Sequence, residues 1–390
     1  MLLTMTVIWL VMLLYIALRA VYPLPLRLRW KLLVIALLLP GALKAVLLRL
    51  FVPGGRYFAP DADPALLLPL TWWNQLLLLL FLLLLVSELL KPIVWASARM
   101  YGCSLGLRWR RGLAVFHALL LVAAAVMTTL GMRHALALPQ VRELTVELPG
   151  MPADAAPVRL ALLADLHADT LKRESFFRPL VAEVNALQPD VVAIAGDFVD
   201  GAVEQHGASL APLRELRAPL GVYGVLGNHD YYSGAEEWRS FLQSQGVRIL
   251  CNEHALLGQS GIVLAGVTDL SAPDSDHPDT EAALQDVPQG SPVVLMAHQP
   301  RFARTAAASG RVHLQLSGHT HGGMMRGFDA LLAPFNDGFV SGLYKVGQMK
   351  LYVSPGTSLW SGMLLRLGVP SEITLITLKP VAPSAEEQGS

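Results

Sequence analysis

The chain has 390 residues, enough for two or three domains, and a net charge of zero. Hydrophobic residues make up 53% of it and charged residues only 15%, whereas about a quarter of the residues in a soluble globular chain are charged. The neutral balance argues against a protein that binds nucleic acid. The apolar excess is concentrated in the first third of the chain, which indicates membrane segments.

Four apolar runs cover residues 2–18, 32–51, 70–87 and 113–132. Each is close to the roughly 20 residues that cross a bilayer. The second is the weakest, because Pro40 and Gly41 interrupt it and Lys44 would lie in the apolar layer unless its ammonium group reaches outward. Buried helices of a soluble core are the alternative, but four such runs leave too little polar surface to cover them. We therefore expect an all-α transmembrane region of about four helices over residues 1–135.

Basic residues between the runs predict the orientation of the chain. They lie after the first run and after the third run (Arg19, Arg27, Arg29, Lys31; Lys91, Arg99, Arg108, Arg110, Arg111). If all four runs cross, both basic connections face the cytoplasm and everything after Met132 faces outward. If the second run is re-entrant, this argument fails. The first run lacks a positive charge before it and a small-residue cleavage site, so we predict a retained helix and not a signal peptide.

After Met132, short apolar strands alternate with amphipathic helices, a pattern typical of an α/β domain with covered sheets. The strands are predicted at 158–165, 191–197, 222–228, 262–267, 293–298, 312–319, 350–354 and 372–378, and helices at 173–187 and 211–217. We expect a linker and a first strand over 136–156, the α/β domain over 157–380 and a disordered tail over 381–390.

Five of these strands lead into polar residues. The residues are Asp165 and His167, then Asp197 and Asp200, then Asn228, His229 and Asp230, then His298, and finally His319 and His321 in the segment SGHTHGG. Each group alone has an ordinary explanation as a helix cap, a turn or a core hydrogen bond. Together they predict a metal site, because ligands gather at the carboxyl ends of strands in α/β sheets. Asp, His and Asn without thiolates suit Mn, Fe, Zn, Ni or Co.

The blocks DLH, GDFVD, GNHD, AHQP and GHTH, in this order, resemble those of the calcineurin-like metallophosphoesterases. The resemblance covers residues 158–378. The glycine pair after the last block and the ending PSEITLITL are similar to the membrane-anchored bacterial branch of that family. The resemblance implies a four-layer αββα sandwich, in which two packed sheets carry helices on both outer faces.

The resemblance also implies roles for individual residues. Two divalent ions would be held, one by Asp165, His167 and His321 and the other by Asn228, His298 and His319, with Asp197 bridging them. His229 would contact the phosphate or protonate the leaving oxygen, and Asp200 would orient its imidazole.

The implied activity is hydrolysis of a phosphoester or phosphoanhydride by metal-activated hydroxide, in one in-line step without a covalent enzyme intermediate. The partners would be a phosphorylated substrate and the bilayer, with no nucleic acid. A multi-pass protein of the plasma (inner) membrane with an extracytoplasmic site favours phospholipid, lipid-linked sugar phosphate or cell-envelope substrates. Two alternatives stay open: a cytoplasm-facing UDP-diacylglucosamine-type pyrophosphohydrolase, and a non-catalytic membrane sensor or scaffold.

The chain departs from these relatives at Met324 and Met325, where they carry glutamine, and in the segment PGTSLWSGMLLRLG, which is glycine-rich in the family. Apolar side chains gather near both departures (Phe328, Leu331, Leu332, Phe335, Phe339, Trp360, Met363, Leu364, Leu365). They either enter the bilayer or hold an acyl chain, or they pack as an ordinary loop or on the transmembrane helices.

Overall fold

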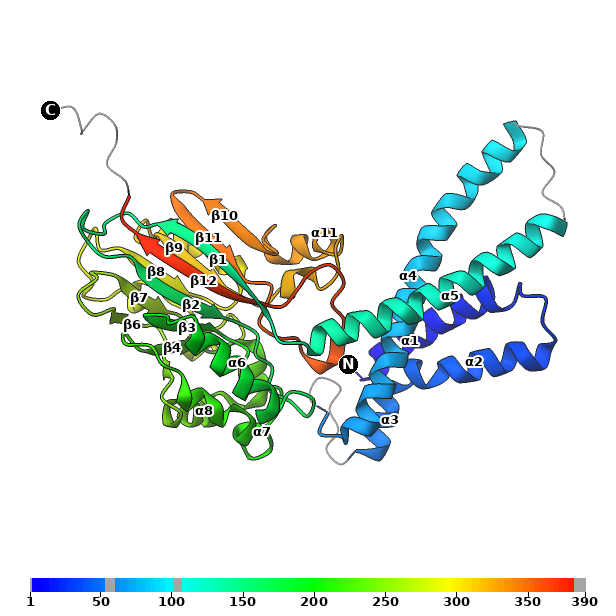
Figure 1. The fold of residues 1–390 in the computed structure, drawn as a ribbon, viewed down its shortest axis with the longest axis horizontal. Helices are drawn as coiled ribbons and strands as arrows, with labels where there is room; N and C mark the ends of the chain where they lie inside the picture. Colours follow the sequence, from blue (N-terminus) through cyan, green and yellow to red (C-terminus); the bar gives the residue numbers. More distant parts are fainter. Residues whose placement is uncertain (1, 53–59, 101–106, 382–390) are drawn as a thin grey trace. The chain divides into compact units, whose positions relative to one another are not determined.

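The computed structural model describes residues 2–52, 60–100 and 107–381 (Figure 1). The chain forms two compact units. A helical unit contains Met1–Arg133 together with Ser361–Leu365, and an α/β unit contains His134–Trp360 and the residues from Arg366 onward. The tail predicted to be disordered lies outside the described residues, except for its first residue, Val381.

The helical unit begins with α1 (Leu2–Ile16), which continues into the π-helical turn η1 (Ala17–Val21). It continues with α2 (Leu28–Ala42), α3 (Lys44–Phe51), α4 (Pro64–Met100) and α5 (Leu107–Leu136). In the described part of the chain three helical segments are long and apolar enough to cross a membrane, and they lie at Leu3–Val21, Pro64–Met100 and Gly112–Leu136. The pair α2 and α3 passes the same test only when counted together, and it is bent by 63°.

The bent pair is the second apolar run of the sequence, and Pro40 lies just before the bend, where it removes a helical hydrogen bond. Lys44 is buried in the helical unit, where its Nζ lies 3.4 Å from the carbonyl oxygen of Ser361. Asn74 on α4 donates a hydrogen bond of 3.0 Å to the carbonyl oxygen of Gly41. The polar groups of this run are thus paired inside the unit, and Lys44 does not reach outward.

Helix α4 is longer than the apolar run that predicts it, because it extends to Met100. Lys91 and Arg99 therefore lie on the helix and not on a connecting loop. Lys91 contacts Glu88 one turn earlier at 2.5 Å, and Glu88 also pairs with Arg19. The number of membrane crossings remains a prediction.

The α/β unit contains two six-stranded sheets. The first has the order β1 (Gln140–Glu147), β12 (Glu372–Lys379), β2 (Val158–Leu163), β3 (Val191–Ala195), β4 (Val222–Val225) and β5 (Arg248–Ile249). The second has the order β10 (Gly342–Val346), β11 (Met349–Val353), β9 (Leu314–Ser317), β8 (Val293–Met296), β7 (Val263–Gly266) and β6 (Glu253–Leu256). Strands β2 to β5 pair in parallel, and so do β7, β8, β9 and β11, so their carboxyl ends lie along one edge of each sheet.

The two sheets pack face to face through a shared apolar core, to which β2 contributes Leu160 and Leu162 and β9 contributes Leu314 and Leu316. Helices α6 (Glu174–Ala186), α7 (Val203–Leu210) and α8 (Asn228–Ser244) cover the outer face of the first sheet. The short helices α9 (Thr280–Ala283) and α10 (Ala303–Ala308) cover the second. This architecture confirms the predicted four-layer αββα fold.

Several local elements differ from the sequence prediction. Strand β2 ends at Leu163 and β3 ends at Ala195, so the polar residues that follow lie in loops and not on the strands. Residues 211–217 form the 3-10 turn η2 (Ala211–Glu215), not an α-helix. The short strands β5, β6 and β10 were not predicted; β10 joins β11 through a tight hairpin turn.

Candidate metal centre

The loops that follow the parallel strands have an unusual backbone. Asp165, His167, Asp197, His319 and His321 all have positive φ angles, between 44° and 73°. This left-handed region costs a non-glycine residue about 1 kcal/mol or more, and such residues cluster at functional sites. Five of the seven predicted metal ligands therefore adopt a conformation that only the surrounding structure can maintain.

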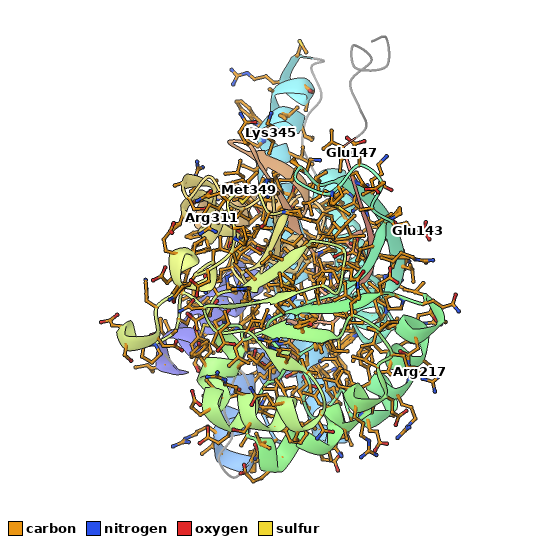
Figure 2. All side chains as sticks on the ribbon, turned by 90° about the vertical axis from the view of Figure 1, so that its left-hand side faces the viewer. Glu143, Glu147, Arg217, Arg311, Lys345 and Met349 are labelled. Carbon is orange, nitrogen blue, oxygen red and sulfur yellow. The ribbon has the colours of Figure 1, made fainter. Side chains whose placement is uncertain are left out.

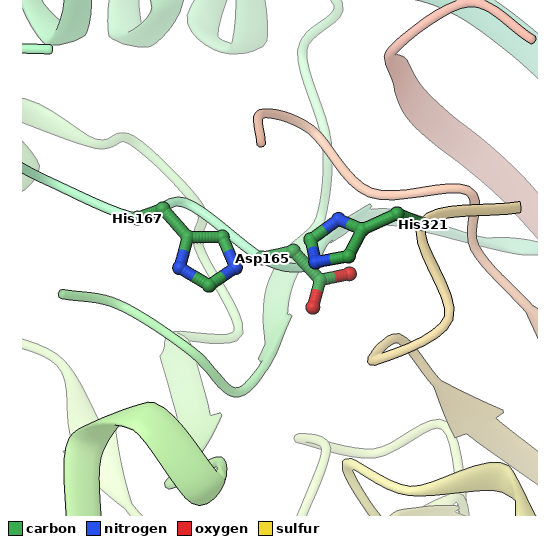
Figure 3. Close-up of side chains that lie close together, drawn as sticks. All are labelled: Asp165, His167 and His321. Atoms are coloured by element: carbon green, nitrogen blue, oxygen red, sulfur yellow. The ribbon is translucent and has the colours of Figure 1, made fainter. Parts of the chain in front are cut away.

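Three of these residues form a first group. One ligand atom from each of Asp165, His167 and His321 lies within 4.8 Å of the other two, and all three side chains are buried. Figure 3 shows Asp165 and His167, from the loop after β2, beside His321, from the loop after β9. Among the described residues, His167 Nε2 and His321 Nδ1 have no hydrogen-bond partner. Buried nitrogens without partners are costly, and a divalent cation would satisfy both, so this group fits a metal ion.

A second group contains Asp197, His298 and His319, whose ligand atoms also lie within 4.8 Å of one another. The Asn228 side-chain oxygen joins them, at 3.2 Å from His298 Nε2 and 2.9 Å from His319 Nδ1. His298 Nδ1 donates to the carbonyl oxygen of Ala195 at 2.7 Å, so Nε2 is the ring nitrogen that faces the other ligand atoms. The structure thus brings together the four residues predicted around the second ion.

Asp197 lies between the two groups. Its Oδ2 is 3.2 Å from His298 Nε2 and 3.7 Å from His167 Nε2. A carboxylate in this position could contact ions held by both groups. Its other oxygen, Oδ1, accepts a hydrogen bond from the backbone amide of His229 at 2.8 Å. A Cβ at Gly227 would lie 2.3 Å from Asp197 Oδ1, so only glycine allows the GNHD loop to approach this closely.

For His298, burial is outweighed by the Asp197 carboxylate, which raises the pKa well above its usual range. Burial favours the neutral, metal-binding form of two other candidate ligands. It lowers the pKa of His319 to about 3 and the pKa of His321 well below its usual range. Both imidazoles are therefore neutral near pH 7, and the neutral imidazole is the form that ligates a metal ion.

His229 and Asp200, which the sequence predicts as the acid and its orienting partner, contact each other. His229 Nδ1 lies 2.5 Å from Asp200 Oδ1, and Asp200 Oδ2 lies 3.1 Å from His167 Nδ1. Burial disfavours the charged imidazole, but the carboxylates of Asp197 and Asp200 raise the pKa of His229 to about 9. Because Asp200 contacts Nδ1, the Nε2 of His229 is available to donate a proton.

Asp230 is a site residue to which the sequence assigns no role. Its Oδ1 accepts hydrogen bonds from the backbone amides of Phe198 (2.8 Å) and Val199 (3.2 Å), and its Oδ2 accepts one from Gly227 (2.8 Å). Burial and the nearby Asp197 raise the pKa of Asp230 to about 8. This one side chain fastens the loop that carries Asp197 to the loop that carries the GNHD block.

We expect Asp230→Ala to destabilise the α/β unit by about 3 kcal/mol, because three buried amides lose their acceptor. Asp230→Asn keeps one carbonyl oxygen, so its stability should lie between those of the alanine variant and the wild type. Scanning calorimetry of the full-length protein in detergent measures the effect. Asp154→Ala, at an exposed position, is the control. Equal unfolding temperatures for Asp230→Ala and the wild type would contradict the role of Asp230 in joining the two loops.

Arg366 is a second residue without a predicted role. Its guanidinium is buried and donates hydrogen bonds to the carbonyl oxygens of Pro355 (2.8 Å) and Ser358 (2.7 Å). The loop that it holds includes Gly356, where a Cβ would lie 3.0 Å from Asp165 Oδ2. Arg366 therefore fixes the loop against the first ligand group. The only sequence signal for this role is the presence of an arginine within the apolar stretch that starts at Trp360.

A pocket of about 440 Å³ opens beside the ligand groups. Asn228, His319 and His321 contribute to its lining, together with apolar or aromatic side chains (Tyr232, Met324, Leu332, Phe335, Trp360) and polar ones (Ser271, Gln299, Arg301). The rings of Tyr232 and Trp360 each lie 5.8 Å from the ring of His229. Phe335 is 76% exposed, whereas Leu364 and Leu365 are buried. Some of the apolar residues noted in the sequence, such as Phe335, thus line the pocket, whereas others, such as Leu364, are buried by ordinary packing.

Comparison with known proteins identifies the family. Residues 158–323 match the family described as calcineurin-like phosphoesterase. The chain is 36% identical over 273 residues to a transmembrane protein with metallophosphoesterase domain from Danio rerio, covering 67% of this chain and 62% of that protein. It is 38% identical over 253 residues to an uncharacterized metallophosphoesterase of Helicobacter pylori, covering 64% of this chain and 66% of that protein.

A transmembrane protein with metallophosphoesterase domain from Bos taurus is 34% identical over 302 residues, which cover 74% of this chain and 67% of that one. The chain thus spans about two thirds of the length of these relatives. They include animal as well as bacterial proteins, so the similarity is not restricted to a bacterial branch. This chain belongs to the calcineurin-like phosphoesterase family.

Proposed function

We propose that this protein is a membrane-anchored phosphohydrolase that uses two divalent metal ions. The observation that carries the proposal is the position of the Asp197 carboxylate between two groups of buried ligands. The first ion would be held by Asp165, His167 and His321. Asn228, His298 and His319 would hold the second, and Asp197 would contact both.

Two such ions, when bound, supply an activated water at neutral pH and stabilise the oxygens of an in-line displacement at phosphorus. Nitrogen and oxygen donors without thiolates suit Mn, Fe, Zn, Ni or Co. The protein's own residues orient the reaction. The His229 imidazole, held by Asp200, donates its Nε2 proton to the departing oxygen. The rings of Tyr232 and Trp360 flank this imidazole.

We further propose a lipid or cell-envelope substrate and a multi-pass anchor in the plasma membrane, with residues 1–135 as the transmembrane region and 157–380 as the catalytic domain. The apolar helices support the anchor. The apolar side of the pocket supports the substrate class, because Leu332 and the exposed Phe335 offer a surface to an acyl or prenyl chain.

Replacing Phe335 tests the substrate class. Phe335→Ser should raise KM for a long-chain phospholipid substrate by about 10-fold or more, since an apolar side chain of this size contributes about 1.5–3 kcal/mol when buried. KM for para-nitrophenyl phosphate should change less than about threefold. Leu256→Ser, which removes another exposed apolar side chain outside the pocket, is the control. Equal effects on both substrates would exclude a chain-binding role.

The side of the membrane on which the catalytic domain lies is tested separately. Four crossings place the catalytic domain on the same side as the amino terminus, which we propose is outside. The 63° bend between α2 and α3 favours a second candidate, in which the pair is re-entrant and the number of crossings is three. The catalytic domain would then face the cytoplasm, as a UDP-diacylglucosamine-type pyrophosphohydrolase requires. A carboxyl-terminal reporter that is active only in the cytoplasm would overturn the outward orientation.

The activity is tested with full-length protein purified in detergent. The protein is stripped of metal by a chelator, reloaded with Mn²⁺, and offered a phosphomonoester, a phosphodiester, a phospholipid and a nucleotide-sugar lipid. We expect hydrolysis of at least one substrate, lost on chelation and restored by metal. Two bound ions per chain without turnover of any substrate would instead favour a non-catalytic sensor or scaffold.

A further inference from the structure

The pocket beside the metal centre has an unequal distribution of charge. Apart from the histidines, Arg301 is the only charged side chain among the described residues that line it. The pocket lining contains no carboxylate in the part of the chain that the structure describes. Arg301 is an exposed residue, and within the described ranges no hydrogen bond or ion pair involves its guanidinium. A cation with these properties is available to bind a ligand.

The chain places Arg301 close to a candidate metal ligand. Arg301 follows His298 by three residues, within the 3-10 turn η4 (Pro300–Phe302). Pro300 fixes one backbone angle of this turn, and the side chain of Phe302 is buried beneath it. The Arg301 charge also acts on His319, so it lies within electrostatic range of the second ligand group. The side chain of Arg301 therefore starts from the same short segment that carries a candidate metal ligand.

Two divalent ions would already compensate the charge of a single phosphoryl group. A further cation that lacks a protein partner is expected where the substrate carries a further anion. Arginine is suited to this task, because its planar guanidinium can form two parallel hydrogen bonds to phosphate oxygens. We infer that Arg301 binds a second phosphate group of the substrate, so that the preferred substrate is a diphosphate and not a simple monoester.

This inference rests on the proposed function, because the first phosphate is taken to lie at the metal centre. It can be tested without turnover. Methylphosphonate and methylenediphosphonate differ by one anionic group, and neither is cleaved by hydrolysis at a phosphoester bond. Titration calorimetry with the full-length, Mn²⁺-loaded protein in detergent gives the affinity for each, and measuring the metal content before and after excludes extraction of metal by the diphosphonate.

We expect the wild type to bind the diphosphonate about 10- to 100-fold more tightly than the monophosphonate, the range expected for a hydrogen-bonded pair of charged groups. Arg301→Ala should lose most of this preference, and Arg301→Lys should keep part of it. Arg217→Ala is the matched control, because Arg217 is also exposed, lies at the surface of the α/β unit (Figure 2) and does not line the pocket.

An unchanged preference in Arg301→Ala, or an equal affinity of the wild type for both ligands, would overturn the inference. A parallel assay separates this failure from failure of the proposed function. In that assay the wild type and Asp197→Asn are compared for hydrolysis of a prenyl diphosphate and the monophosphate of the same alcohol. If neither protein hydrolyses either ester, the proposed hydrolysis fails for these substrates, whereas the phosphonate titration still decides whether Arg301 recognises a second anion.

Discussion

Replacing Asp197 with asparagine is expected to reduce metal-dependent hydrolysis by more than about 10³-fold. The Asp197 carboxylate is the only group in the described structure that lies within 4 Å of a histidine nitrogen from each ligand group, His167 Nε2 and His298 Nε2. Asparagine has almost the same shape but presents one neutral oxygen and one NH₂ group. It therefore lacks the negative charge that would hold two cations close together, and we expect weaker binding of at least one of them.

The measurement is kcat together with bound metal per chain. We expect Asp197→Asn to bind fewer than two ions and to remain folded, because the substitution keeps the side-chain volume at this buried position. The control is Asp154→Asn, an isosteric change of an exposed carboxylate, which should keep both metal content and activity. A variant with full activity and a full metal content would show that Asp197 does not bridge a catalytic pair.

The fold was largely predictable from the sequence, because its strongest signals are local. Short apolar strands followed by amphipathic helices predict a covered α/β sheet, and the structure confirms the four-layer arrangement. The missed strands are short or lie at sheet edges. Strand β5 has two residues, and β10 alternates half-buried and exposed side chains. Such segments owe their conformation to pairing with a neighbouring strand, and this pairing is not visible in a single sequence.

The grouping of the candidate ligands at one edge of the sheets was predictable for a different reason. Each ligand follows a strand directly, so the position of a residue along the chain indicates its position at the sheet edge. Asp230 and Arg366 were not predictable in this way. Their roles depend on which backbone amides and carbonyl oxygens surround them, such as the amide of Phe198 and the carbonyl oxygen of Ser358. These partners lie in loops whose backbone conformation is not visible in the sequence; Phe198, for example, follows the left-handed Asp197.

Replacing His229 with glutamine is expected to lower kcat by about 10²- to 10⁴-fold for esters of alkyl alcohols, the range that general acid catalysis supplies. Asp200 holds His229 Nδ1 at 2.5 Å, and the Asp197 and Asp200 carboxylates favour the protonated ring. An alkoxide is a poor leaving group and needs this proton. A para-nitrophenolate ion is a good leaving group and does not.

The leaving-group dependence of kcat therefore distinguishes proton donation from a structural role. His229→Gln should lower kcat less than about tenfold for para-nitrophenyl phosphate, and the loss should increase steadily with the pKa of the leaving alcohol. Asp200→Asn should show the same trend with a smaller loss, because the imidazole remains but is no longer held. His254→Gln, which replaces a histidine that contacts the carbonyl oxygen of Ala283, is the control and should show no trend. An equal loss on every ester would mean that His229 binds the phosphoryl group without donating a proton, because binding to that group is the same whichever alcohol departs.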